Sequence, residues 1–286
     1  MSGKMTSKAS LLKMALVATG SLIISSCNKL DLIYSWSENY LVYELDHYFD
    51  LTNSQEKKIK KEFKAKLNLF LIENDQKIMK YINDYQQMIV ISEFDQLKEF
   101  SEMHRSWFNE FAVAMLPLIL EVSSELTEDQ VMEFKEKFQK KLEKDSKKDK
   151  IKQVQSRLKR WMELIGLKPD VEQKKIVDVF AEKKSLPSEL QRENTQKNFD
   201  RFLAVYKDEV QRKLFLEQLF TKLEFARNAE YSEALKSYIH GQIEVQKAIL
   251  KTLSEKQKTE IIAHLKKHET EMRKLLVRVK KETVNN

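Results

Sequence analysis

The chain has 286 residues, of which 51 are Lys or Arg and 44 are Asp or Glu, so its formal net charge is +7. Basic and acidic residues are mixed along the chain and form no one-sided basic stripe, which argues against a nucleic-acid-binding protein. Its four glycines and three prolines provide neither a Gly-rich phosphate loop nor a G-x-S-x-G nucleophile elbow. We therefore expect no nucleic-acid partner and no cofactor.

The N-terminal region has the layout of an export signal. Three lysines precede a mostly apolar run at residues 14–24, and the small residues Ser25 and Ser26 follow. The run is shorter than the ~20 apolar residues that span a bilayer. A basic stretch, a short apolar stretch and small residues are typical of a signal peptide. We expect residues 1–26 to be removed on export.

Cys27 is the only cysteine in the chain. The stretch Ile24-Ser25-Ser26-Cys27 resembles the lipobox of bacterial lipoproteins, in which an aliphatic residue and two small residues precede a cysteine. The resemblance implies that the Cys27 thiol takes a diacylglyceryl group, so that residues 27–33 form a lipid-anchored segment. By analogy with lipoprotein sorting, Asn28 in place of Asp implies the outer membrane, facing the periplasm. The alternative is a free cysteine behind an ordinary signal peptide.

An aromatic-rich segment follows the expected anchor. Trp36, Tyr40 and Tyr43 would share one face of a helix. That face has two possible surroundings, because Tyr and Trp suit both a membrane interface and a protein core. We expect the helix to pack into the domain and to end at the junction Asp50-Leu51-Thr52.

The same segment carries a resemblance to a known family. Trp36 is followed by Asp46-His47-Tyr48-Phe49-Asp50-Leu51-Thr52, and a second stretch contains Arg157, Lys159, Arg160, Trp161 and Gly166. The pattern resembles a family of uncharacterised bacterial lipoproteins with a D-x-Y-F-D-L-T helix junction. The resemblance implies an all-helical, lipid-anchored envelope protein, and it supplies no catalytic residues.

Apolar residues recur at steps of three and four through most of the remaining chain. Such runs occupy residues 59–85, 100–115, 131–142, 202–223 and 261–279. Each run places one apolar stripe on a helix, and the stripes must be buried against one another. The sequence therefore predicts an all-α fold, an antiparallel bundle of long amphipathic helices, as a single domain over residues 34–286.

A short signature repeats at the expected helix starts. It comprises Leu51-Thr52-x-x-Gln55, Leu126-Thr127-x-x-Gln130 and Leu253-Ser254-x-x-Gln257. In a capping box the hydroxyl at the first position and the Gln three residues later exchange hydrogen bonds with backbone N–H groups. Leu167-Lys168-Pro169 is a degenerate fourth case, with Pro169 expected in the first helical turn.

The first two signatures also resemble the L-T-x-x-Q motif of some periplasmic helical proteins, which include chaperones and stress-sensing adaptors. The third departs from the motif at Ser254. The resemblance implies an alternative function, a periplasmic chaperone-like or envelope-stress module.

The pair His264 and His268 and the single His47 are the histidines whose neighbours could support chemistry. His264 and His268 are one helical turn apart and could present two imidazoles to a metal ion, with Glu260 and Glu271 nearby. A zinc site needs three or four ligands, so we expect packing or surface roles instead. His47 lies between two aspartates, but no nucleophile accompanies it. We expect a non-catalytic binding or structural protein; a metal-dependent or acid/base enzyme is the least favoured alternative.

Overall fold

The computed structural model describes residues 30–146, 149–184, 187–222 and 225–284. These residues form eleven α-helices and no strand, which confirms the predicted all-α class. In chain order the helices are α2 (Leu30–Phe49), α3 (Asn53–Glu73), α4 (Asp75–Ile91), α5 (Leu97–Glu125), α6 (Glu128–Ser146), α7 (Lys150–Leu164), α8 (Val171–Lys183), α9 (Ser188–Val205), α10 (Glu209–Thr221), α11 (Ala229–Lys251) and α12 (Glu255–Val284).

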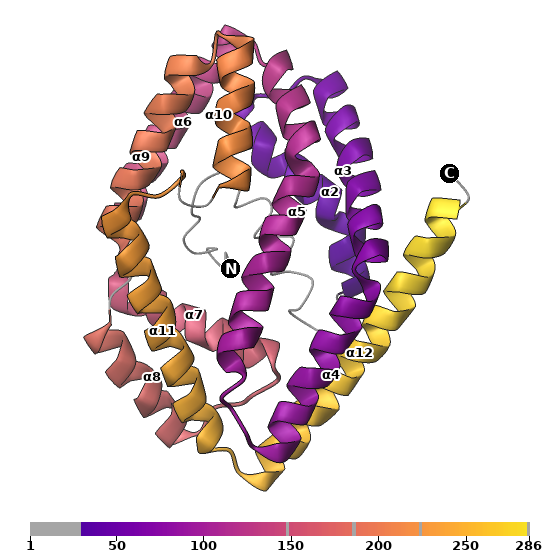
Figure 1. The fold of residues 1–286 in the computed structure, drawn as a ribbon, viewed down its shortest axis with the longest axis vertical. Coiled ribbons are helices and arrows are strands. Elements are labelled where there is room, and N and C mark those ends of the chain that lie inside the picture. The colour runs from indigo at the N-terminus through magenta and orange to yellow at the C-terminus, as the bar shows by residue number, and fades with distance from the viewer. Residues whose placement is uncertain (1–29, 147–148, 185–186, 223–224, 285–286) are drawn as a thin grey trace, which may run out of the picture.

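The chain runs up and down between two ends of an elongated molecule (Figure 1). The α2–α3, α5–α6 and α9–α10 junctions lie at the upper end. The α4–α5, α7–α8 and α11–α12 junctions lie at the lower end. Successive passes run in opposite directions, and α2 with α3, α7 with α8, and α9 with α10 pack as sequence neighbours. α4 instead continues the direction of α3, and α12 packs on α4 rather than on α11.

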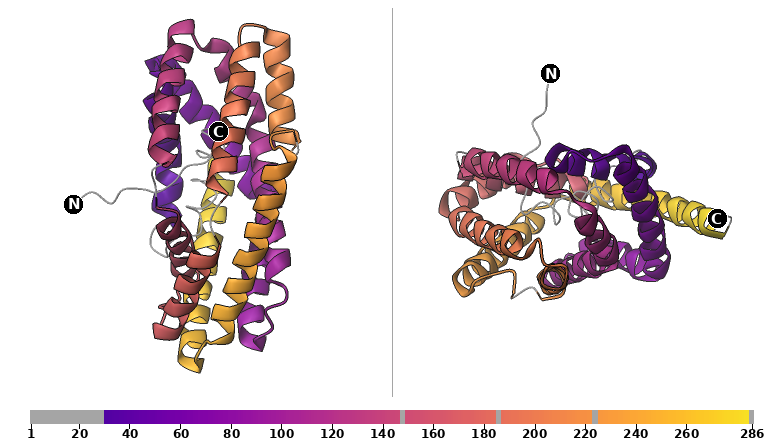
Figure 2. Two further views of the ribbon diagram at one scale, coloured as in Figure 1. Left: turned by 90° about the vertical axis from the view of Figure 1, so that its left-hand side faces the viewer. Right: turned by 90° about the horizontal axis from the view of Figure 1, so that it is seen from above.

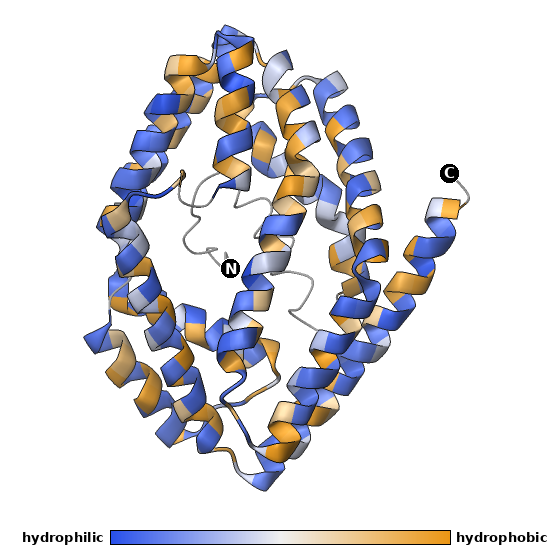
Figure 3. Ribbon diagram, in the orientation of Figure 1, coloured by the Kyte–Doolittle hydropathy of each residue, from blue (hydrophilic) through white to orange (hydrophobic). Residues whose placement is uncertain are grey.

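Seen from above, the helices form a closed ring (Figure 2). α5 packs on α3 and on α10, α11 packs on α8, and α6 packs on α9 and on α2. The C-terminal helix α12 closes the ring because it packs along α4, α3 and α2. Hydrophobic and hydrophilic residues alternate along each helix, in keeping with one buried and one solvated face (Figure 3).

The buried apolar residues form two clusters. The upper cluster draws on α2, α3, α5, α6, α9, α10, the start of α4 and the second half of α12, and it includes the fully buried Ile59 and Phe63. The lower cluster draws on α4, α7, α8, α11 and the first half of α12, and it includes Val154, Leu158 and Ile249. The two clusters meet near the middle of the ring.

The α2–α3 junction forms as predicted. α2 ends at Phe49, and Asp50 takes a left-handed conformation with φ of 50°. The Leu51 N–H donates to the Asp46 carboxylate at 2.9 Å, and Thr52 caps α3 with a complete capping box. α2 begins at Leu30, so the helical domain starts before the predicted boundary at residue 34.

The prediction that Trp36 and Tyr43 pack into the core is wrong. Their side chains are 64% and 68% exposed, while Leu41, Tyr48 and Phe49 on the same helix are buried. α2 is rich in apolar residues on more than one side, and only one side faces the ring. The aromatic residues outside that side therefore remain on the surface.

All four helix-start signatures act as caps. Thr52, Thr127 and Ser254 exchange hydrogen bonds with Gln55, Gln130 and Gln257 respectively, as predicted. In the fourth case the cap is Asp170, which pairs with Gln173, and α8 begins at Val171. Pro169 thus precedes the cap, and its predicted place in the first turn is wrong.

The four capping glutamines form two reciprocal pairs, one at each end of the ring. At the upper end the Gln55 and Gln130 amides bond to each other, and their Nε2 atoms reach the carbonyls of Glu125 and Asp50 at 3.2 and 3.0 Å.

At the lower end Gln173 and Gln257 bond to each other in the same way. Their Nε2 atoms also reach the Thr252 hydroxyl and the Lys168 carbonyl, both at 3.2 Å. In every case the acceptor residue lies two positions before the partner's cap. Each pair therefore ties two helix junctions together, and it does so with the side chains that make the caps.

The reciprocal pairing predicts strong coupling between Gln55 and Gln130. Replacing either with Ala leaves the other buried amide without its partner, so the second replacement should cost less than the first. In a double-mutant cycle followed by urea unfolding, we expect a coupling free energy of about 1–2 kcal/mol.

Gln139 and Gln196, which share a single hydrogen bond at 3.0 Å away from any cap, provide the control. Their coupling should stay below ~0.5 kcal/mol. Additive effects of Gln55→Ala and Gln130→Ala would show that the upper junctions are held independently.

Burial of Phe49 predicts a large cost of truncation. The ring is 7% exposed, and its centroid lies 4.5 Å from that of Phe134. Phe49→Ala should lower the free energy of unfolding by ~3–5 kcal/mol. The exposed Tyr43→Ala on the same helix should change it by less than ~0.5 kcal/mol. Equal effects in a thermal or urea melt would contradict the observed orientation of α2.

Candidate functional site

The upper half of the ring encloses a large apolar cavity. Its volume is about 390 Å³, and its walls come from α2, α3, α5, α6, α9, α10 and the start of α11. Aromatic and aliphatic side chains dominate the lining, among them Phe63, Phe134, Phe199 and Phe215. Native cores contain few voids larger than a water molecule. A cavity of this size therefore offers room for a ligand.

A second cavity of about 160 Å³ lies below the first, where the two apolar clusters meet. α3, α4, α5, α7 and α12 form its walls, together with Leu30, the first residue of α2. Phe108 on α5 lines both cavities. The two spaces are therefore neighbours separated in part by one aromatic ring.

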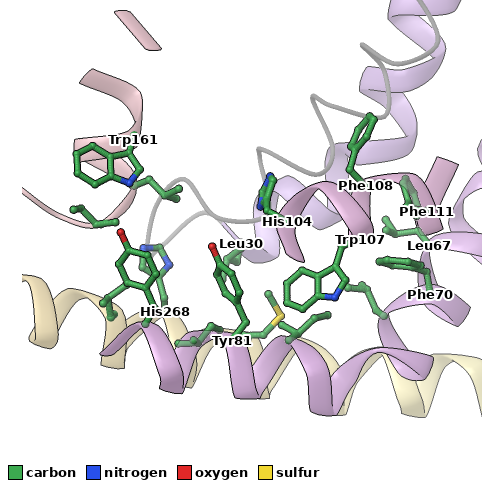
Figure 4. A pocket seen from close by; sticks show the side chains of 18 residues that line it. Leu30, Leu67, Phe70, Tyr81, His104, Trp107, Phe108, Phe111, Trp161 and His268 are labelled. Carbon is green, nitrogen blue, oxygen red and sulfur yellow. The ribbon is translucent and has the colours of Figure 1, made fainter. Parts of the chain in front are cut away.

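The lower cavity has an aromatic end and a more polar end (Figure 4). Trp107, Phe108 and Phe111 gather at the first, and Trp161 and His268 lie at the second. The Tyr85 hydroxyl lies beside the Trp161 indole. Tyr81 and His104 also line the cavity, between these two ends.

Two buried polar atoms at the polar end are unsatisfied. Among the described residues the His268 Nδ1 has no hydrogen-bond partner, and the Tyr85 hydroxyl has no group that accepts its proton, because the neighbouring Trp161 indole N–H can only donate. Tyr85 is 6% exposed and His268 is 5% exposed. Buried polar atoms are nearly always hydrogen-bonded in native proteins, so such exceptions need an explanation.

The other nitrogen of His268 is occupied. His268 Nε2 and His264 Nε2 lie 2.8 Å apart, and the His264 ring also hydrogen-bonds the Leu164 backbone. We assign the His264 proton to Nδ1, because Nε2 faces His268 and because, although burial lowers the His264 pKa, the hydrogen bond to the Leu164 backbone acts to raise it, as expected where the ring donates. His264 Nε2 is then the acceptor from His268 Nε2–H. In this arrangement the His268 Nδ1 presents a lone pair.

Burial keeps these histidines neutral. Desolvation, followed by the neighbouring His264 and Lys267 charges, lowers the pKa of His268 to about 4. Burial also lowers the pKa of His264 and that of His104, which lines the same cavity. Burial raises the pKa of Tyr81 to about 12. The lining titratable groups are therefore uncharged near neutral pH.

Gly166 makes the position of His264 possible. It ends α7 with φ of 76°, while Gly166 N–H and Leu167 N–H donate to the Glu163 and Met162 carbonyls. These are the two hydrogen bonds of a Schellman motif. A Cβ at Gly166 would come within 2.4 Å of His264 Cγ. Only glycine allows both the turn and this close approach.

The structure brings together some of the predicted site residues. His264 and His268 contact each other, but no described group of three His, Cys, Asp or Glu residues could hold a metal ion. His47 is exposed on α2, and its neighbour Asp46 accepts the Leu51 N–H of the helix junction.

Other predicted elements lie elsewhere. The Leu-Thr-x-x-Gln side chains lie at the upper junctions, away from the lower cavity. Cys27 and the segment 1–29 lie outside the described residues. None of the described helices combines the length and hydrophobicity needed to cross a bilayer.

The comparisons with known proteins found no significant match to family models, curated proteins or solved structures.

The buried His268 predicts a loss of stability in mild acid. Its folded-state pKa of about 4 lies below the ordinary 6.5, so the unfolded chain takes up the proton first. Stability is complete above pH 6.5 and falls as the pH drops toward 4, by about 3 kcal/mol. Urea unfolding between pH 7 and pH 4.5 measures this slope.

His268→Leu removes the titrating group and should reduce the slope in that window. His264 and His104 also have lowered pKa values, so part of the slope should remain. An unchanged slope in His268→Leu would mean that this histidine is as easily protonated in the folded protein as in the unfolded chain.

Proposed function

We propose that this chain is a lipid-anchored protein of the bacterial envelope, facing the periplasm, whose helical ring binds an apolar ligand. The observation that carries the proposal is the upper cavity of about 390 Å³ with its aromatic and aliphatic walls. Ligand sites are typically concave, mostly apolar and ~300–1,000 Å³ in volume. The role is binding, without catalysis.

The composition of the walls supports an apolar ligand. The polar side chains at the upper cavity include Asn194 and Asn198, and both donate to the Ala226 carbonyl that holds the turn before α11. Their hydrogen bonds are thus used within the protein. Each CH₂ group that a ligand buries against the remaining surface would contribute ~0.8 kcal/mol.

The start of α2 supports an anchor beside this interior. Leu30 lines the lower cavity and lies three residues after Cys27. On the outer side of the same helix, Leu32, Trp36 and Tyr43 form an exposed stripe at helical spacing. Tyr and Trp favour the membrane interface. A lipid at Cys27 would hold this stripe close to the bilayer.

Cavity-filling variants test the binding role. An apolar fluorescent probe, N-phenyl-1-naphthylamine, is titrated into the full-length protein. Leu219→Trp places a larger side chain in the upper cavity, while Leu214→Trp changes an exposed residue of the same helix α10. We expect Leu219→Trp to weaken probe binding at least fivefold and Leu214→Trp to leave it unchanged. Absence of binding to the wild type would refute the proposal.

The anchor has its own test. Cys27→Ala should abolish incorporation of an alkyne-labelled fatty acid and release the protein from membranes. Ser26→Ala keeps a small residue before the cysteine, so its lipidation should match that of the wild type. Membrane association and processing that persist in Cys27→Ala would exclude the lipoprotein assignment while leaving the cavity test intact.

A further inference from the structure

The polar end of the lower cavity restricts the chemistry of a ligand. His268 and Tyr85 are buried and line the cavity, and among the described residues His268 Nδ1 lacks a partner and the Tyr85 hydroxyl proton lacks an acceptor. Stranding two such atoms costs free energy that a bound group could recover. A ligand that placed a polar group there would gain hydrogen bonds that the protein itself leaves open.

The hydrogen-bond chain fixes which partner each atom needs. In the assigned tautomer His264 donates to the Leu164 backbone and accepts from His268 Nε2–H, so His268 Nδ1 can only accept. The tyrosine hydroxyl can donate or accept. The complementary group therefore carries a hydrogen donor for His268, and an oxygen that can accept from Tyr85.

The surroundings favour an uncharged group. None of the described side chains that line the lower cavity is Asp, Glu, Lys or Arg. An ion buried here would lose its hydration without gaining a counter-charge. A hydroxyl satisfies both hydrogen-bonding requirements and remains neutral.

The rest of the ligand faces apolar walls. Beyond Tyr81 and His104, which lie nearer its middle, the cavity ends at Trp107, Phe108 and Phe111 (Figure 4). Phe108 also lines the upper cavity, so a chain that continued past it would enter the larger apolar space. An extended alkyl tail fits this path.

We propose that the lower cavity binds the uncharged, hydrogen-donating end of a long-chain ligand, a hydroxyl group on an alkyl chain, which donates to His268 Nδ1 while the tail extends past Phe108. The inference rests on the proposed function, because it assumes that the ring interior binds an apolar molecule.

A series of matched probes tests the polar end. 1-Dodecanol, 1-methoxyundecane and dodecanoate have similar lengths, but the ether lacks the donor and the carboxylate carries a charge at neutral pH. Each competes with N-phenyl-1-naphthylamine for the full-length protein at pH 7. We expect the alcohol to bind at least tenfold more tightly than either of the others.

Variants at the polar end of the lower cavity show which residue causes the preference for the alcohol. His268→Leu should bring the alcohol and the ether to within twofold of each other, whereas His268→Gln keeps a hydrogen-bond acceptor and should retain part of the preference. Tyr85→Phe should weaken alcohol binding by a smaller factor. Unchanged naphthylamine binding shows that each variant is folded.

The outcomes separate the two proposals. If the naphthylamine itself does not bind, the proposed function fails. If it binds but none of the three alkyl probes displaces it, the assignment of a long-chain ligand is overturned. If all three bind equally, or dodecanoate binds best, the apolar interior stands and the assignment of a neutral hydroxyl end is overturned.

The orientation of the bound alkyl ligand is tested by tryptophan quenching with 12-bromododecan-1-ol, whose bromine lies at the tail end. Trp161→Phe retains Trp107 near the tail, and Trp107→Phe retains Trp161 near the polar end. The exposed Trp36 gives the same background in both. We expect stronger quenching in Trp161→Phe. Stronger quenching in Trp107→Phe would reverse the orientation and overturn the proposal.

Discussion

The reciprocal pairing of capping glutamines, which occurs once at each end of the molecule, is the interaction on which the closed ring depends. Each of the four glutamines satisfies a helix N-terminus and, at the same time, bonds to the glutamine of another junction. A cap alone would define where a helix begins. The pairing also defines which junctions lie side by side, at both the upper and the lower end. The walls between the ends can then leave space in the middle, because their relative positions are already set.

A hollow interior lowers the free energy of unfolding of a protein of this size. Unfilled volume forfeits dispersion contacts, and unpaired polar atoms add a desolvation cost. The ring tolerates both because its helices are long and its two clusters are extensive, with many fully buried side chains such as Phe63, Leu158 and Ile261. The cavity therefore follows from how the helices are arranged, since the walls that surround it are well packed against one another.

The sequence predicted the parts of this structure that depend on local chemistry. Apolar periodicity identified the regions of α3 to α6, α9, α10 and α12, although the runs 59–85 and 202–223 each span two helices, and no run was predicted for α7 or α11. The Thr–Gln and Ser–Gln spacings identified three caps. Asp170 was missed because the cap lies three residues after Leu167, rather than directly after the leucine as in the other three signatures.

The lower cavity could not be read from the sequence, because His268, Tyr85 and Trp161 come from α12, α4 and α7, and no local pattern says that these helices meet. The error at Trp36 and Tyr43 has the same origin. A helix with apolar residues on several sides does not reveal which side the remaining chain will cover.

The position of α12 has a consequence for assembly. This helix supplies His268 and Met272 to the lower cavity and packs along α4, α3 and α2, yet it comprises the last described residues of the chain. The upper glutamine pair involves residues 55 and 130 only, so it can form before the second half of the chain has been synthesised. The wall of the lower cavity, in contrast, stays incomplete until the thirty residues of α12 have been added. The lower cavity is therefore accessible first and completed last.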